Sequence, residues 1–238
     1  MSSRLKESLN MFTAPRVPVN LMYGCVQGKD AFYARVTSEF YREAMRRHSK
    51  FPLIRRLQFG VALCSLPAYF DEYFMMVEAA ARRNFKKAER NGYRVQPINF
   101  NDYLNDIGAI RASAEVRQGA MPSDYLAGTV QACANPQPQT STHDYPYFGV
   151  IKEGKLVAYA GVLIAGELAM VEHILGHAAY QADGVVPMLF IGIANHLLGH
   201  YPAVRYYGYG SYFGAGETMR RFKRKFCFTP HRVAWVLG

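Results

Sequence analysis

The sequence predicts an α/β (α+β) fold in which a mixed, mainly antiparallel twisted sheet is flanked by helices, with a helical and strand extension ahead of it. Two tight hairpin signals, Glu153-Gly154 and Ala165-Gly166, join three strand-like runs between residues 147 and 177. Helical patterns alternate with strands on both sides of this antiparallel meander. Half of the 238 residues are hydrophobic, which is enough to bury a substantial core.

Residues 1–92 are expected to form the extension and residues 93–238 the main domain. In the extension we expect a helix around residues 29–47, a strand region that ends at Pro67, and a long helix over residues 70–91. Gly92 supplies the stop signal for that last helix. Its apolar residues recur at helical spacing and predict a buried face: Val77, Ala81, Phe85 and Ala88.

The main domain is expected to begin with a short strand near residues 93–99, followed by a helix between Asn101 or Asp102 and Gly119. A Pro- and Gln-rich loop over residues 134–146 leads into the meander. A helix over residues 185–198 follows, with Pro187 in its first turn, where the missing N–H costs nothing. A strand, a short basic helix and a last strand then close the chain.

The charge of the chain favours anionic partners. Twenty-eight Lys and Arg residues outnumber eighteen Asp and Glu residues, which gives a net charge of +10 and favours nucleic acid, a nucleotide cofactor or anionic lipid. The four cysteines are widely scattered, as expected of reduced thiols. The polar first residues show no secretory signal, and polar residues interrupt both long apolar stretches. We therefore expect a cytoplasmic protein without a membrane span.

The stretch "RRNFKKAERNGY", residues 82–93, places five cationic side chains in nine positions. Two interpretations are open. The cations, Lys86 and Lys87 among them, form the solvated side of an amphipathic helix and oppose the negative end of its dipole, or they hold an anionic group such as a phosphate. A second basic cluster, residues 220–225, lies near the end of the chain.

From Tyr93 to Gly238 the order of elements resembles the GNAT acyltransferase superfamily. The segment "RRFKRKFCFTPHRVAW" is similar to the last helix and strand of that superfamily, with Cys227 and Phe228 in place of a Gly-Phe pair. The stretch "RRNFKKAERNGY" resembles the basic helix of Fem-type enzymes, which are two-lobed GNAT relatives that transfer aminoacyl groups from tRNA. The pair Phe222-Lys223 is also Fem-like, whereas a complete second lobe does not fit into the residues that precede Tyr93.

The resemblance implies a phosphate-bearing donor: acyl-CoA, an acyl carrier or an aminoacyl-tRNA. In GNAT enzymes the pyrophosphate of acyl-CoA binds a loop after the fourth strand and the N-terminus of the next helix, where free N–H groups favour anions. The family pattern there is Gln or Arg, two residues, Gly, one residue, then Gly or Ala. Gln181 and Gly184 match it, Val185 occupies the variable position, and Val186 departs from it, as does the acid Asp183.

By the same resemblance Glu172 is the candidate catalytic base, and Tyr209 or Tyr212 donates the proton to the leaving group. A carboxylate within "AMVEHIL" is costly to bury alone, so a functional role and a structural ion pair both remain open. The alternation of a strand places Glu172 and His173 on opposite faces. His173 and Lys223 are candidate substrate-binding residues, with Lys86 and Lys87. The tyrosines also fit a purely structural, aromatic role.

We expect no metal site, because the histidine pairs His173/His177 and His196/His200 lack an identifiable third ligand. The leading hypothesis is an acyltransferase or aminoacyltransferase with an amine acceptor. A second hypothesis is a GNAT-like enzyme that acts on DNA or RNA, or uses tRNA, through the phosphate contacts of the two basic clusters. A third is a GNAT-shaped binding protein without catalytic activity. The oligomeric state is left open.

Overall fold

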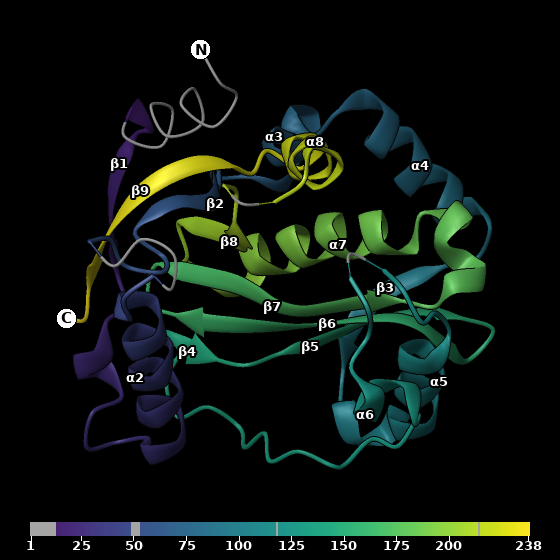
Figure 1. Cartoon of the computed structure of the whole chain (residues 1–238), viewed down its shortest axis with the longest axis horizontal. Coiled ribbons are helices and arrows are strands. Elements are labelled where there is room, and N and C mark those ends of the chain that lie inside the picture. Colours follow the sequence, from purple (N-terminus) through teal and green to yellow (C-terminus); the bar gives the residue numbers. More distant parts are fainter. Residues whose placement is uncertain (1–12, 49–52, 118, 214) are drawn as a thin grey trace.

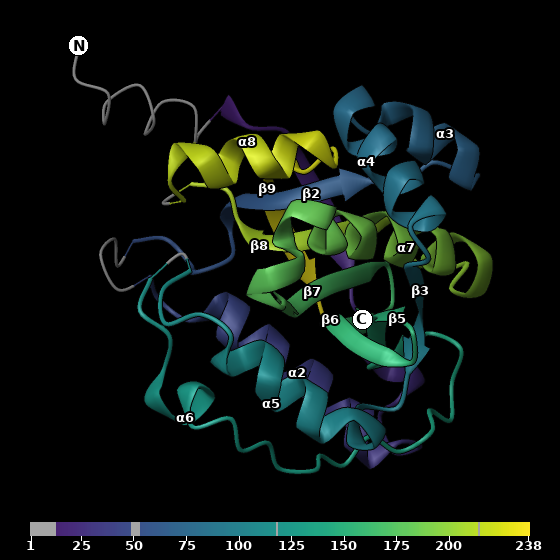
Figure 2. The same cartoon turned by 90° about the vertical axis from the view of Figure 1, so that its right-hand side faces the viewer.

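The computed structural model describes residues 13–48, 53–117, 119–213 and 215–238. Nine strands in this part of the chain form one mixed sheet with the order β1-β9-β2-β8-β7-β6-β5-β3, and β4 pairs with β6. Most neighbouring strands are antiparallel, and helices cover both faces (Figures 1 and 2). The predicted fold class is therefore confirmed.

The strands are β1 Arg16–Asn20, β2 Phe59–Ser65, β3 Arg94–Ile98, β4 His143–Asp144, β5 Tyr147–Lys152, β6 Lys155–Ala165, β7 Leu168–Gly176, β8 Tyr206–Ser211 and β9 Thr229–Val236. The helices are α2 Ala31–Met45, α3 Phe70–Met76, α4 Ala79–Arg90, α5 Leu104–Ala112, α6 Ser123–Leu126, α7 Val185–His200 and α8 Glu217–Lys225. Three short 3-10 helices are η1 Tyr23–Cys25, η2 Phe100–Tyr103 and η3 Ala178–Asp183. No helix among the described residues is long and apolar enough to cross a bilayer.

The antiparallel meander forms as expected from its turns. β5, β6 and β7 pair in succession, and both residues of the first turn, Glu153 and Gly154, have positive φ angles, as a two-residue type I′ hairpin requires. Gly166, in the second turn, also has a positive φ, and a Cβ there would lie 2.5 Å from the backbone oxygen of Asn20. Local turn chemistry thus fixes the centre of the sheet.

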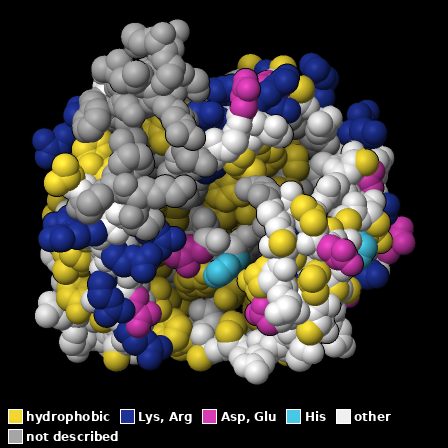
Figure 3. All heavy atoms as spheres, in the orientation of Figure 1, with side chains coloured by type: hydrophobic (Ala, Val, Ile, Leu, Met, Phe, Trp, Pro, Cys, Tyr) yellow, Lys and Arg dark blue, Asp and Glu magenta, His cyan; other side chains and the backbone are white. Residues whose placement is uncertain are grey.

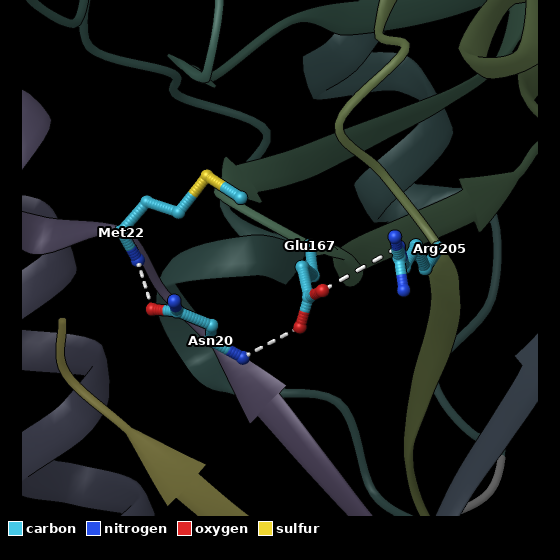
Figure 4. A network of polar contacts seen from close by, with 4 residues as sticks. All are labelled: Asn20, Met22, Glu167 and Arg205. Atoms are coloured by element: carbon cyan, nitrogen blue, oxygen red, sulfur yellow. Dashed lines mark hydrogen bonds and ion pairs between the residues drawn. The ribbon is translucent and has the colours of Figure 1, made fainter.

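Strands from the first 92 residues complete the same sheet. β2 lies between β8 and β9 and is antiparallel to both, while β1 is parallel to β9. Figure 4 shows how Glu167, in the β6–β7 turn, ties β1 to the main domain: its carboxylate accepts a hydrogen bond from Asn20 N at 2.9 Å and pairs with Arg205 Nε at 3.5 Å. Asn20 Oδ1 in turn accepts from Met22 N at 2.8 Å. The sheet therefore crosses the predicted boundary at residue 92.

The two faces of the sheet are covered differently. On one face α3, α4, α7 and α8 share a continuous apolar core with strands β2, β5, β6, β7 and β8. The other face has two separate cores, one under α2 and one under α5, and these helices lie at opposite ends of that face (Figure 1). The middle of the second face is thereby left without a covering helix of its own.

The long helix expected over residues 70–91 is two helices, α3 and α4. The chain breaks at Val77, whose backbone is extended, because Glu78 N donates to Lys225 O of α8 at 2.9 Å and not to the carbonyl four residues before it. The predicted apolar face still packs into the core, since Val77, Ala81 and Ala88 are buried. The contact that interrupts the helix comes from the far end of the chain.

The turn between α8 and β9 keeps the geometry of the motif it resembles. Cys227 has a φ of 66°, in the left-handed region that favours glycine, at the position where the GNAT superfamily carries a glycine. Phe228, which follows, is fully buried against Tyr207 of β8. The departure from Gly-Phe therefore changes the residue and leaves the turn in place.

Candidate active site

β7 and β8 run parallel and separate halfway along their length. Their pairing joins Leu168, Ala169 and Met170 of β7 to the first half of β8 and extends no further. The first four residues of β7 are buried, whereas the next two, Glu172 and His173, are exposed. Figure 3 shows a hollow in the middle of this face of the molecule, with histidine and acidic side chains beside it. The parting of the strands thus opens a site over the middle of β7.

A β-bulge lies at Glu172. His173 pairs with Gly161 and Val171 with the next residue, Val162, so that Glu172 stands between them without a partner in β6. A bulge interrupts the alternation of side chains and re-aims the residue that it contains, which is a recurrent feature of active sites. It explains why Glu172 and His173 are both exposed, whereas strict alternation places them on opposite faces.

Tyr145 holds the carboxylate of Glu172. Its hydroxyl donates to Glu172 Oε2 at 2.9 Å, and among the described residues no cationic side chain pairs with Glu172. Burial raises the pKa of the Tyr145 hydroxyl above its ordinary value, and the charge of Glu172 raises it further, so the hydroxyl keeps its proton and acts as a donor. Glu172 is therefore held by a hydrogen bond from a tyrosine and not by the ion pair considered from the sequence.

The backbone of Tyr145 is itself fixed. Its N–H donates to Asp144 Oδ1 at 2.7 Å, and its carbonyl accepts from Asn135 Nδ2 at 3.0 Å. Gly161 of β6 makes room for the ring, because a Cβ there would lie 3.1 Å from the rings of Tyr145 and Tyr147. Tyr145 was not singled out from the sequence; the glycine within an otherwise apolar strand was the only local signal of a close approach.

Lys223 is a buried residue of α8 whose ammonium group lies beside the end of β8. It is 5% exposed, and its Nζ donates to the carbonyl oxygens of Tyr209 at 2.6 Å and Ser211 at 2.7 Å. The ammonium also lies 4.6 Å from the centroid of the Tyr209 ring, within reach of a cation–π interaction. Burial lowers the pKa of Lys223 to about 8. The structure therefore brings Lys223 and Tyr209 together, and neutral groups hold the cation.

The two candidate proton donors have different surroundings. The Tyr209 ring is half-buried and lies 4.9 Å from the ring of Phe190 in α7. Tyr212 is buried: its N–H donates to Gly60 O at 2.6 Å, and its hydroxyl accepts from Arg224 Nη1 at 2.9 Å. Tyr212 thereby anchors the end of β8 to β2 and α8, which fits a structural role.

The segment with Gln181, Gly184, Val185 and Val186 lies after β7 and at the start of α7, where the resemblance places the pyrophosphate loop. Gln181 is exposed and Val185 is buried. The Gly184 N–H already donates to Gln181 O at 3.1 Å, Pro187 has no N–H, and the Asp183 carboxylate accepts a hydrogen bond from Tyr93. An acid and few free donors make a poor site for a pyrophosphate.

Residues 176–178, just before this segment, are held by hydrogen bonds to residues at and after the end of α5. Ala178 N donates to Ser113 Oγ at 3.0 Å. Arg117 donates to Gly176 O at 2.8 Å through Nη1, and through Nη2 to Ile110 O and Ser113 Oγ, both at 2.9 Å. Burial lowers the pKa of the Arg117 guanidinium, which has no carboxylate partner among the described residues. The backbone of this segment therefore does not fit the phosphates of coenzyme A.

Lys86 and Lys87 are exposed on α4, which packs against α7 and η3. Asn84 lies beside Gly184, because its Cβ is 3.7 Å from where a Cβ of Gly184 would be. Lys87 follows Asn84 by three residues and therefore lies on the same side of α4. Lys86 Nζ is 5.6 Å from the centroid of the Phe74 ring. The structure thus brings Lys87 to the side of α4 that adjoins the loop.

The two histidine rings of α7, His196 and His200, stack on each other. The rings of His196 and His200 are 3.9 Å apart, and burial, with a smaller contribution from His200, lowers the pKa of His196 to about 4. Across the described ranges there is no group of three His, Cys, Asp or Glu side chains with the spacing of a metal site.

No family model and no curated protein matches the sequence. Among solved structures the chain resembles FemX with a TM-score of 0.55 at 8% sequence identity, over 74% of this chain and 60% of that one. It also resembles L-PGS from Bacillus licheniformis (TM-score 0.46, 15% identity, 71% and 57% covered) and a tandem GNAT protein from the clavulanic acid biosynthesis pathway (0.41, 17%, 59% and 43%). The chain spans less than two thirds of each.

The likeness to FemX concerns the fold. It confirms the GNAT-like architecture and the Fem-type resemblance expected from the sequence, and it assigns no activity at this level of identity.

Proposed function

We propose that the protein is an acyltransferase or aminoacyltransferase that moves an acyl group from an ester or thioester donor to an amine. The observation that carries the proposal is the exposed Glu172 carboxylate, set in a bulge where β7 parts from β8 and held by Tyr145. The fold shared with FemX supports the same class of reaction.

In this proposal Glu172 acts as the general base. It accepts a proton from the acceptor amine while the nitrogen attacks the acyl carbonyl, and the tetrahedral intermediate collapses by breaking the bond to the donor oxygen or sulfur. Tyr145 keeps the carboxylate oriented but remains protonated. His173, exposed beside Glu172, is in place to contact the acceptor.

Lys223 is suited to the negative charge that develops during the reaction. An ammonium has three donors, and carbonyl oxygens occupy two of them, so the third remains for the carbonyl oxygen of the donor or for its leaving group. Tyr209, which lies against this ammonium, is a better candidate for the proton donor than the anchored Tyr212. Protonation of the leaving oxygen or sulfur completes the proton balance.

The poor fit of the loop to a pyrophosphate favours an aminoacyl-tRNA or an acyl carrier over acyl-CoA as donor. Such carriers are held over a larger surface, to which the cation Lys87 beside the loop contributes. The four cysteines among the described residues are free, in keeping with the reducing cytoplasm in which we place the protein.

A donor panel tests the proposal. Native mass spectrometry of the purified protein identifies any bound donor, and the protein is then incubated with acyl-CoA, acyl carrier or aminoacyl-tRNA together with a panel of amines. We expect one donor class to be consumed and an amide to form. The control is Glu89→Gln, the same change on the exposed side of α4, which should leave the rate unchanged. Equal rates for Glu172→Gln and wild type, or no consumption of any donor, would count against the proposal.

A further inference from the structure

α8 and α4 meet end to end at one edge of the molecule. The C-terminal carbonyl of Lys225 in α8 accepts the hydrogen bond from Glu78 N, directly before α4, and α3 ends two residues earlier at Met76. Figure 2 shows the three helices next to one another along this edge. We call the following residues of these helices, with Tyr69 directly before α3, the junction patch: the exposed Tyr69, Met75, Met76, Arg83 and Arg221, and the half-buried Arg82 and Lys225.

No ion pair within the described part of the chain involves the cations of this patch. Among the described residues no carboxylate pairs with Arg83, Arg221 or Lys225. Arg82 donates through Nη1 to the thioether sulfur of Met75 at 3.0 Å, which is a weak acceptor, and its buried Nε has no hydrogen-bond partner among the residues that the structure describes. An anion outside the chain would supply the missing acceptors.

The helix dipole accounts for Lys225, in the last turn of α8, but not for the cations at the start of α4. Lys87 and Arg90 oppose the negative C-terminal end of α4, but Arg82 and Arg83 lie near its N-terminal end, where positive charge is unfavourable. Lys225 of α8 adds a further positive charge at the same junction. The exposed carboxylates of Asp71, Glu72 and Glu78 lie on the same edge, so the attraction of an anionic surface depends on the cations of α4 and α8.

Large apolar side chains protrude beside the cations. Tyr69, Met75 and Met76 are 70%, 66% and 52% exposed. Figure 3 shows basic, acidic and hydrophobic side chains next to one another along the upper edge of the molecule. A polynucleotide backbone offers phosphates but no apolar environment for the two methionines. The boundary of a bilayer offers both, because apolar side chains enter it while Lys and Arg contact anionic headgroups.

We infer that the junction patch docks the protein on an anionic lipid bilayer. The three apolar side chains insert at the headgroup boundary, and the cations of α4 and α8 contact lipid phosphates. This inference does not depend on the transferase activity, so either can fail without the other.

Vesicle co-sedimentation tests the inference. The full chain is mixed with phosphatidylcholine vesicles with or without phosphatidylglycerol. We expect binding only to the anionic vesicles, weakened by salt. The double variant Arg83→Glu/Arg221→Glu should lower the partition coefficient by roughly a hundredfold. Tyr69→Ser/Met76→Ser leaves the charge unchanged and should lower it by roughly tenfold, since buried apolar area contributes to such binding. Thermal melts confirm that each variant folds.

The matched control is Arg35→Glu/Arg42→Glu, two exposed cations of α2 on the other face of the sheet, with the same change in net charge. Its partition coefficient should stay within about threefold of wild type, because only distant charge is altered. Equal losses in both double variants would overturn the inference in favour of non-specific attraction. So would absence of binding to anionic vesicles, including the case in which the patch binds tRNA or an acidic peptide instead.

Discussion

The two halves of β7 have opposite properties although they belong to one strand. From Leu168 to Val171 every residue is buried, and the first three are paired with β8. From Glu172 onward β7 is paired with β6 alone, and the side chains of Glu172 and His173 are exposed. The buried half contributes to two cores, and the parted half carries the candidate base. The comparison teaches that the site arises where pairing ends, so changes in the two halves should separate activity from stability.

The largest effect is expected in the parted half. Glu172→Gln keeps the shape of the side chain but removes the base, so the rate of acyl transfer should fall by about a thousandfold. The melting temperature should change little, because the side chain is exposed. Steady-state kinetics with the donor found in the panel provide the measurement. A large loss of stability in this variant would show that the carboxylate is structural.

The paired half should respond in the opposite way. Leu168 is fully buried in the core under α2, so Leu168→Ala should lower the free energy of unfolding by about 3 kcal/mol through lost burial and the cavity left behind. Below the melting transition the transfer rate should remain near that of wild type. Chemical denaturation measures the first quantity, and a strong loss of activity in fully folded protein would contradict the separation.

Lys223 should make stability depend on pH. Its pKa is lowered to about 8 in the folded protein and lies near 10.4 in the unfolded chain, so between these values the unfolded state binds more protons. The free energy of unfolding should therefore rise with pH from about 8 to 10, by up to about 1 kcal/mol per pH unit. Lys223→Met should lack this rise. Denaturation curves of both proteins at several pH values test it, and parallel slopes would show that Lys223 does not titrate in this range.

The smallest effect concerns the tyrosine that holds the base. Tyr145→Phe removes the hydrogen bond to Glu172 and should lower the transfer rate by about tenfold through poorer orientation of the carboxylate. Tyr41→Phe on α2 is the matched control. Equal transfer rates in the two variants would show that Tyr145 does not orient the carboxylate of Glu172.

Elements specified by local signals could be predicted from the sequence. The turns at Glu153-Gly154 and Gly166 fixed the meander, and the order of the later elements led to the GNAT-like fold. The break between α3 and α4 could not be predicted, because it depends on a hydrogen bond from Glu78 to Lys225. Neither could the place of β2 between β8 and β9, which only the assembled sheet determines.

In the candidate site, too, some residues could be predicted from local signals and others could not. Glu172 stood out because a carboxylate interrupts an apolar run, and Lys223 because of the Fem-like motif. Tyr145 and the bulge did not, since the bulge depends on the register between β6 and β7 and the hydrogen bond spans 27 residues. The hydrogen bonds from Ser113 and Arg117 to residues 176–178 could not be predicted either, because they join segments that lie about sixty residues apart in the sequence.

Chemical rescue tests the central claim most directly. In Glu172→Gly the side chain is removed, and a small carboxylate such as formate can occupy its place above β7. If Glu172 is the general base, added formate should restore transfer in a saturable manner, and acetate, a stronger base, should restore more per bound molecule. A rate that stays the same with and without added carboxylate in the folded variant would contradict the account.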